Sequence, residues 1–217
     1  KCTYLRSYNP NIPLNNKAIE SAAIMINHAE KPLILAGHGV LISRAEKELK
    51  EFAEKAGIPV ALTLLGLSAF PAGHRLYAGF LGMHGNYGPN LLTNEADLII
   101  AIGMRFDDRV TGNLKKYAKQ ARIIHIEIDK AEINKNVMVD LELYNDAGEV
   151  LKALTPLVNK SSHEKWIREF RIWKMPSGVA DRIAASWSFL ALISRSAFFR
   201  RTDCRIRVVV GDHVGLV

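Results

Sequence analysis

The stretch Pro32-Leu33-Ile34-Leu35-Ala36-Gly37-His38-Gly39 decides the fold, because a short unbroken apolar run ends directly in a glycine-rich turn. A run of this kind is typical of a strand whose two faces are both buried, as they are when helices cover a parallel sheet on both sides. The glycines end the strand and allow the backbone to turn. We therefore predict an inner strand of a parallel sheet at this run.

The segments around this run alternate between helical and strand-like patterns. Asn15 or Asn16 can cap a helix before it, and Ser43 can cap a helix that ends at Ala56. Strands that alternate with helices, without hairpin signals, predict an α/β fold: a three-layer αβα domain whose parallel, Rossmann-like sheet has about six strands. Further strands are predicted at residues 58–64, 96–102, 122–128 and 139–143, and helical segments at residues 90–95, 113–119 and 147–158.

Length and composition describe an ordinary globular domain. Of the 217 residues, 48% are hydrophobic and 24% are charged, so neither a disordered nor a membrane protein is indicated. Cys2 and Cys204 lie near opposite ends without zinc-ligand spacing, which argues against a disulfide framework or a metal site and favours the reducing cytoplasm. The chain opens on Lys-Cys-Thr-Tyr with no secretory signal, so we expect an internal piece of a longer protein.

The net charge of +7 raises the question of nucleic-acid or membrane binding, but much of this charge lies in one segment. Residues 172–217 contain seven Lys and Arg against three Asp, and no Glu. We expect no nucleic-acid partner, because aromatic residues are not interleaved with the basic ones. We also expect no membrane partner, because the composition is that of an ordinary globular domain. Nonspecific nucleic-acid binding through the basic segment, or a basic helix on a membrane surface, remains the alternative.

The carboxyl ends of the predicted strands carry the residues with the most binding chemistry. In an open parallel sheet these ends meet at one edge, where ligands bind. Gly37-His38-Gly39 can bring the backbone close to a phosphate at a helix start, and a plain turn between strand and helix is the alternative. Glu127 can accept hydrogen bonds from ribose hydroxyls or an adenine edge, and an ordinary capping or solvated acid is the alternative there.

Two further loops add to this edge. Arg105 and Arg109 can clamp a pyrophosphate, or else form local salt bridges with Asp107 and Asp108. The glycines of the segment GMHGN at residues 82–86 indicate a loop that passes close to a cofactor. No paired carboxylates, nucleophile motif or metal-ligand spacing accompanies these residues. The residues therefore favour binding over catalysis, with no catalytic residue and no metal ligand expected.

Four segments resemble the middle domain of the acetolactate synthase (acetohydroxyacid synthase) large subunit. They are TLLGLSAFP at residues 63–71, LGMHG at residues 81–85, AIGMRFDDRVTG at residues 101–112 and HIEIDKAEI at residues 125–133. In the third segment two arginines flank Phe-Asp-Asp before Val-Thr-Gly, which is highly specific to that family. The resemblance runs from Arg6 to Arg171.

The resemblance implies an activity for the whole enzyme, a transferase that condenses two pyruvates to 2-acetolactate, or pyruvate with 2-oxobutyrate, in branched-chain amino acid biosynthesis. It implies thiamine diphosphate and a magnesium ion in the full-length enzyme, held by domains expected outside this chain. On the middle domain it implies FAD, which takes no net redox part in the reaction. A homo-oligomer and a regulatory subunit are the implied partners, and the fragment alone is expected to be inactive.

The family's FAD contacts carry over onto strand-end residues of this chain. Asp108 and Arg109 also match positions that line the substrate and inhibitor channel of the whole enzyme. Three positions depart from the family, since Glu127 stands where Asp is usual, and Asn145 and Ser68 stand where Gly is usual. The implied FAD contacts are Gly37, His38, Gly39, Thr63, Leu64, Leu65, Met83, His84, Gly85, Asn86, Gly103, Arg105, Arg109, Glu127, Ile128, Asp146 and Ala147.

The resemblance also divides the chain. Residues 1–14 match a linker from an amino-terminal domain, residues 15–160 the FAD-binding central domain, and residues 161–171 a helical linker. Residues 172–217 do not match the family, and we interpret them as an out-of-frame or misassembled coding end. A genuine basic membrane-surface helix, or an adaptor that replaces a lost domain, is the alternative. Alternatives for the domain are the central domain of a pyruvate oxidase or glyoxylate carboligase, and a nucleotide-binding module of sirtuin-like topology.

Overall fold

The computed structural model of the chain describes residues 12–172, 208–210 and 213–215. The chain divides into two compact units, residues 1–175 and residues 176–217. In the second unit, strands β7 (Val208–Val210) and β8 (His213–Gly215) form an antiparallel pair. The predictions made for residues 1–11 and for most of the basic tail fall outside the described residues.

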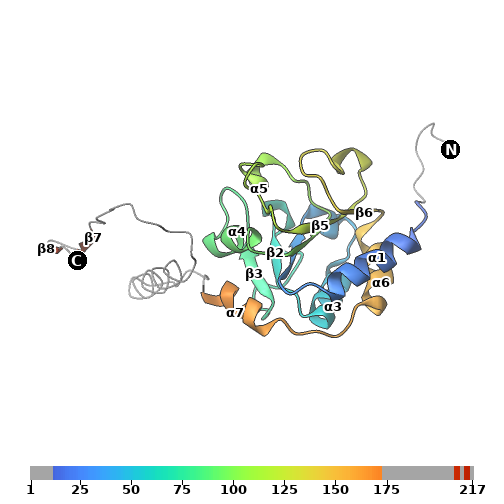
Figure 1. Cartoon of the computed structure of the whole chain (residues 1–217), viewed down its shortest axis with the longest axis horizontal. Coiled ribbons are helices and arrows are strands. Elements are labelled where there is room, and N and C mark those ends of the chain that lie inside the picture. Colours follow the sequence, from blue (N-terminus) through green and yellow to red (C-terminus); the bar gives the residue numbers. More distant parts are fainter. Residues whose placement is uncertain (1–11, 173–207, 211–212, 216–217) are drawn as a thin grey trace. The chain divides into compact units, whose positions relative to one another are not determined.

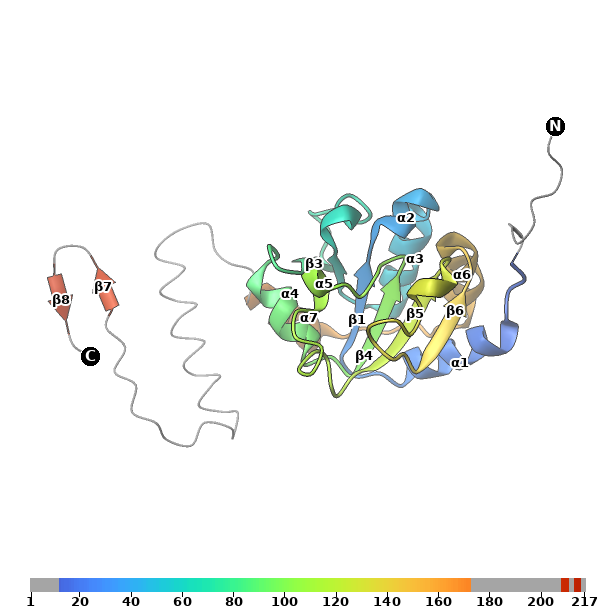
Figure 2. The same ribbon diagram turned by 90° about the horizontal axis from the view of Figure 1, so that it is seen from above.

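A six-stranded sheet, parallel throughout, forms the centre of the first unit (Figure 2). Its strand order is β3-β2-β1-β4-β5-β6, so the chain adds strands to one side of β1, then crosses over to β4 and continues on the other side. Ligands bind at such crossovers in open α/β sheets. The predicted fold class is confirmed. The strands are β1 (Pro32–Ala36), β2 (Val60–Leu62), β3 (Tyr77–Phe80), β4 (Leu98–Ile102), β5 (Arg122–Glu127) and β6 (Leu141–Tyr144).

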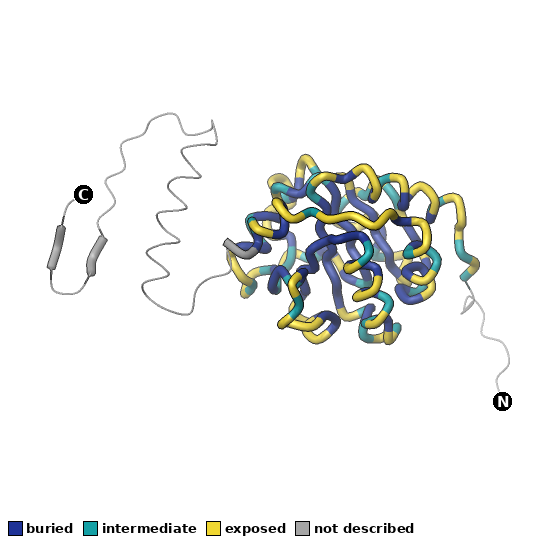
Figure 3. Tube along the Cα trace, turned by 90° about the horizontal axis from the view of Figure 1, so that it is seen from below, coloured by how far each residue is buried: buried dark blue, intermediate teal, exposed yellow. Residues whose placement is uncertain are grey.

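Helices cover both faces of the sheet (Figure 1). On one face α1 (Asn16–Asn27), α3 (Glu46–Ala56) and α6 (Ala147–Leu154) contribute to a single hydrophobic core. On the other face α4 (Tyr87–Thr93) and α7 (Glu164–Ile172) contribute to a second core. The inner strands lie buried between these layers, as the dark blue segments of Figure 3 show.

The inner strands feed the two cores alternately. In β1, Leu33 and Leu35 belong to the core under α4 and α7, whereas Ile34 and Ala36 belong to the core under α1, α3 and α6. Successive side chains of a strand point to opposite faces, so a strand with two buried faces must be apolar at every position. This is why the continuous apolar runs of the sequence located the inner strands.

The capping predictions have different outcomes. Asn15 caps α1, because its side chain accepts a hydrogen bond from the N–H of Ala18 at 3.2 Å. Ser43 was predicted to cap one helix ending at Ala56, and this is wrong. Two helices stand there, α2 (His38–Ile42) and α3, and Ser43 ends the first of them. Arg44 interrupts the helical path with a φ of 55°.

Two segments differ in type from the prediction. Strand β3 was not predicted, because its four residues Tyr77–Phe80 are flanked by a Gly- and Pro-rich loop and contain Gly79, whose φ is 118°. Residues 113–119 form turns instead of the predicted helix. A single short turn has too few hydrogen bonds to offset the cost of starting a helix.

The remaining differences concern the ends of elements, which are the least predictable part of a sequence. The strand predicted at 58–64 shortens to β2, and the weak strand at 139–143 shifts to β6. The helix predicted at 147–158 is α6 followed by a 3-10 turn. Helix α7 begins inside the predicted helical linker at 161–171 and ends one residue beyond it. The 3-10 turn after α6 is η3 (Thr155–Leu157). The remaining short helical segments are α5 (Asp108–Thr111), η1 (Leu64–Gly66) and η2 (Lys130–Glu132).

Candidate functional site

A cleft of 540 Å³ opens at the carboxyl ends of the strands, where the chain crosses from one half of the sheet to the other. Loops that follow β1, β2, β4 and β5 meet there, as the sequence predicts, and the segment after β6 joins them. Small-molecule sites in proteins typically enclose about 300–1,000 Å³. The cleft is lined by His38, Gly39, Ile42, Ser43, Thr63, Leu64, Leu65, Gly103, Met104, Arg105, Asp107, Arg109, Val110, Ile126, Glu127, Ile128, Asn145, Asp146 and Ala147.

Gly37, Gly39 and Gly103 form what we call the glycine interlock, in which the loops after β1 and β4 touch backbone to backbone. A Cβ added to Gly39 would lie 2.6 Å from the Cα of Gly103, and one added to Gly37 would lie 2.4 Å from the carbonyl oxygen of Gly103. The N–H groups of Gly37 and Gly39 donate to the carbonyls of Ile102 and Gly103, at 2.9 and 2.8 Å. These two donors therefore already bond within the protein, and Gly37 lies buried behind the cleft.

Four large apolar side chains stand exposed around the cleft, and we call them the apolar rim. The exposed fractions are 72% for Ile42, 57% for Leu64, 66% for Leu65 and 56% for Ile128. Single exposed apolar residues are common on protein surfaces, but a cluster beside a cleft marks a binding surface. The apolar rim therefore suits a ligand with flat apolar parts.

Glu127 ends β5 at the cleft and is only 8% exposed. Its Oε1 accepts hydrogen bonds from the N–H groups of Ile128 and Asp129, at 2.9 and 3.2 Å. These bonds hold the turn after β5, whereas the helix-capping role that was its alternative interpretation belongs to Asp129, the N-cap of η2. The second oxygen, Oε2, lies 4.0 Å from Nε2 of His125, and burial lowers the pKa of that histidine.

The two predicted arginines both line the cleft and both are exposed. Nη2 of Arg105 lies 3.8 Å from Oδ2 of Asp107, a long and solvated ion pair. Asp107 also caps α5, because its carboxylate accepts a hydrogen bond from Val110 N–H at 3.2 Å. Arg109 forms no ion pair within residues 12–172. Exposed pairs of this kind are weak, so both guanidinium groups are available to an anion.

The start of α6 forms one wall of the cleft. Asp146 caps this helix, accepting from the N–H of Gly148 at 2.9 Å, and it also accepts from the hydroxyl of Ser43 at 2.7 Å. Asn145 is buried; its Nδ2 donates to the carbonyl of Ile12 at 2.7 Å. Ser43 and Asn145 thus join the loops after β1 and β6 and the incoming chain around one cleft.

The segment after β2 closes the cleft beside α2. His38 is exposed, and its Nδ1 donates to the carbonyl of Leu65 at 3.0 Å. Thr63 is 8% exposed and lies where β2 ends. His38 and Thr63 therefore lie on the same side of the cleft as Leu64 and Leu65.

The loop at residues 82–86 is not part of this cleft. Met83 lines a neighbouring cavity of 400 Å³ together with Asp108, and Arg109 lines both cavities. The N–H of Met83 donates to the carbonyl of Arg109 at 2.7 Å, which holds this loop against α5. His84, Gly85 and Asn86 line neither cavity. Tyr117 also lines the neighbouring cavity, and burial raises the pKa of its hydroxyl.

Several cleft residues were not among the predicted contacts. Ile42, Ser43, Met104, Asp107, Val110, Ile126 and Asn145 line it. Ser43 and Asp146 bond across 103 positions of sequence, a relation that no local pattern reveals. Ile42, however, follows the Gly37-His38-Gly39 turn by one helical turn and could have been inferred from that spacing.

In the part of the chain that the structure describes, no group of three or more His, Cys, Asp and Glu side chains is arranged to hold a metal ion. Over the same residues, none of the helices is long and apolar enough to cross a membrane.

The chain matches one protein-family model, the central domain of thiamine pyrophosphate enzymes, over residues 19–154. This range contains the whole sheet and all the strand-end loops that line the cleft.

Among curated proteins, similar chains include three acetolactate synthase subunits. The acetolactate synthase large subunit of Buchnera aphidicola from Schizaphis graminum is 43% identical over 80% of this chain and 30% of its own length. The acetolactate synthase isozyme 3 large subunit of Escherichia coli is 40% identical over 78% of this chain and 29% of its own length. The probable acetolactate synthase large subunit of Methanocaldococcus jannaschii is 47% identical over 69% of this chain and 25% of its own length. The chain thus spans less than a third of each relative.

Proposed function

Because the chain belongs to the thiamine pyrophosphate enzyme family, of which it contains the central domain, we propose that it binds FAD in the strand-end cleft as part of an acetolactate synthase large subunit. The observation that carries this proposal is the composition of the cleft. An apolar rim, two available guanidinium groups and a buried carboxylate surround one space of 540 Å³. A dinucleotide presents flat rings, phosphates and ribose hydroxyls, which these three kinds of group complement.

Different residues would contact different parts of the ligand. Arg105 and Arg109 would hold the phosphates, with His38 beside them, since the N–H groups of Gly37 and Gly39 already bond to carbonyls. Oε2 of Glu127, whose other oxygen is bonded to two backbone N–H groups, would accept from a ribose hydroxyl. The apolar rim would cover the rings, and Thr63, Gly103, Asp146 and Ala147 would form the walls between these points.

The residues Met83, His84, Gly85 and Asn86 have a smaller part in this proposal. They lie beside the neighbouring cavity or outside both cavities. Asp108 lines that neighbouring cavity and Arg109 connects it to the cleft. We assign to Asp108 and Arg109 the wall of a substrate and inhibitor channel, which other domains would complete.

The activity belongs to the longer protein. The three relatives named above are matched over only 25–30% of their length. We propose that the whole enzyme uses thiamine diphosphate and Mg²⁺ to condense two pyruvates, or pyruvate with 2-oxobutyrate, and that the groups for this chemistry lie outside this chain. A cytoplasmic homo-oligomer with a regulatory subunit fits such a biosynthetic enzyme.

Titration of the full 217-residue chain with FAD tests the proposal. Saturable quenching of flavin fluorescence and a rise in thermal stability with FAD concentration are expected, because a ligand that binds only the folded state stabilises it. NAD, which lacks the flavin ring, serves as the comparison ligand and is expected to bind more weakly. Equal stabilisation by both dinucleotides, or by neither, would contradict the assignment of FAD.

A further inference from the structure

His125 occupies a position in β5 where an apolar residue is the ordinary choice. Alternate residues of a strand point to the same face, so His125 shares its face with Ile123 and Glu127. Ile123 lies in the core under α4 and α7, whereas Glu127 lines the cleft. The facing residue on β4 is Ala101, whose small side chain leaves room for an imidazole. His125 is fully buried between core and cleft.

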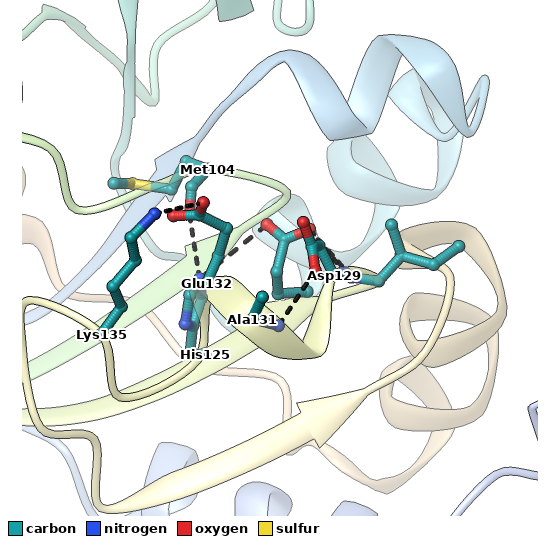
Figure 4. A network of polar contacts seen from close by, with 8 residues as sticks. Met104, His125, Asp129, Ala131, Glu132 and Lys135 are labelled. Carbon is teal, nitrogen blue, oxygen red and sulfur yellow. Dashed lines mark hydrogen bonds and ion pairs between the residues drawn. The ribbon is translucent and has the colours of Figure 1, made fainter. Parts of the chain in front are cut away.

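Only one nitrogen of this buried imidazole is hydrogen-bonded. Nε2 lies 2.9 Å from the carbonyl oxygen of Met104, as Figure 4 shows. Nδ1 has no partner among the residues that the structure describes. A carbonyl oxygen can only accept, so the neutral ring carries its proton on Nε2. The single hydrogen bond is therefore made to the loop that holds Arg105 and Arg109.

The same Nε2 also faces Glu127. It lies 4.0 Å from Oε2, the carboxylate oxygen that is not bonded to the backbone. The ring of Phe106 packs edge-on against the imidazole, with 5.1 Å between ring centroids, and fixes its orientation. Glu132 is the other acid that faces His125, and it is paired with Lys135 at 2.8 Å.

Burying a polar ring in a sheet core destabilises the fold unless the ring is well bonded, so an apolar residue would serve packing better. We propose that His125 is a positioning residue of the cleft: its Nε2–H holds the Met104 carbonyl, and with it the loop 103–109, beside the Glu127 carboxylate. The arginines of that loop and the carboxylate then face one ligand in a fixed relation. The proposal rests on the proposed function in that FAD is the ligand.

Two amide substitutions distinguish the roles of the two ring nitrogens of His125. In His125→Gln the side-chain nitrogen can reach the position of Nε2 and restore the bond to Met104. In His125→Asn the amide ends near the position of Nδ1 and cannot reach that carbonyl. His28→Asn, at an exposed histidine after α1 that lines neither cavity, is the matched control.

Amide hydrogen exchange of residues 103–109 in the ligand-free full chain gives the first measurement. Exchange about tenfold faster in His125→Asn is expected, with His125→Gln and His28→Asn close to the unchanged chain, because one hydrogen bond is lost. The dissociation constant for FAD is expected to rise by a similar factor in His125→Asn alone. Equal behaviour of the Gln and Asn variants would overturn the positioning role.

Failure of the unchanged chain to bind FAD would contradict the proposed function only, since the exchange comparison still decides the role of His125. If His125→Asn does not fold, nitrogen NMR of the unchanged chain decides instead. A neutral His125 with a slowly exchanging proton on Nε2 is expected. A proton on Nδ1, or on both nitrogens at neutral pH, would exclude the proposed hydrogen bond.

Discussion

The glycine interlock and the loop at residues 82–86 resemble each other in sequence but not in structure. The two loops of the interlock and the loop at 82–86 all contain glycine and follow parallel strands, and all were predicted to approach a cofactor. Gly39 and Gly103 do line the cleft, and their tightest contact is with each other. The loop at 82–86 packs on Arg109 and faces another cavity. Paired glycines therefore indicate a close approach of backbone, but not which molecule approaches.

The largest effect is expected for Gly103→Ala. The new methyl group would lie 2.6 Å from the Cα of Gly39, and Gly103 has a φ of 55°, so crowding and a left-handed backbone both oppose the change. We expect the free energy of unfolding to fall by about 3 kcal/mol in urea denaturation. Gly73→Ala is the control, because no atom lies within 4 Å of its added Cβ, and it should change stability by less than about 0.5 kcal/mol. Equal effects at the two glycines would show that the interlock is not tight.

The second prediction compares side chains from the two loops. Arg105→Ala removes a guanidinium group from the cleft, and the dissociation constant for FAD should rise by about tenfold or more, as for the loss of a charged hydrogen bond. His84→Ala, in the other loop, should change it by less than about threefold. Isothermal titration of both variants measures the difference. A larger effect at His84 would move the ligand toward the neighbouring cavity.

A third prediction uses pH. Burial lowers the pKa of His125 below the ordinary value of about 6.5, so between these values the unfolded chain binds a proton that the folded chain does not. The free energy of unfolding therefore has its full value above the ordinary pKa of histidine, and it falls as the pH drops toward the lowered pKa of His125. Urea denaturation from about pH 7.5 to about pH 5.5 should cost the unchanged chain up to about 1 kcal/mol more than His125→Gln. Parallel pH profiles would refute this, and His84→Gln should follow the unchanged chain.

The smallest effect is expected at Ser68. Its φ of 87° lies in the region that favours glycine, the usual residue at this position in the family that the sequence resembles. Ser68→Gly should therefore raise the free energy of unfolding by about 0.5–1 kcal/mol, because relief of backbone strain exceeds the added freedom of the unfolded chain. Thermal unfolding measures the change. A lower melting temperature would mean that the Ser68 backbone is not strained.

Local patterns predicted most of the sheet, because an inner parallel strand must be apolar at every position. The run at Pro32–Ala36 and the run at Leu98–Ile102 became the two central strands. Strand β3 was not predicted, because an edge strand of four residues with a glycine inside it has no such pattern. The break between α2 and α3 was not predicted either, because Arg44 adopts a positive φ although it is not a glycine.

The cleft was predictable where its residues follow strands and unpredictable where distant segments meet. Glu127 ends β5 and Arg105 lies in the loop after β4, so the topology alone brings them to one edge. The bond between Ser43 and Asp146 and that between Asn145 and Ile12 join segments more than a hundred positions apart. Contacts of this kind depend on three-dimensional packing and leave no periodic trace in the sequence.

The glycine interlock also has a consequence for how this domain can change over generations. Its three residues shape the cleft with backbone atoms alone, so almost any substitution there removes the frame together with the site. Ile42, Leu64, Leu65 and Ile128, by contrast, project outward from that frame and support little of the core. Selection can therefore exchange the rim residues one at a time and alter ligand preference while the fold is preserved.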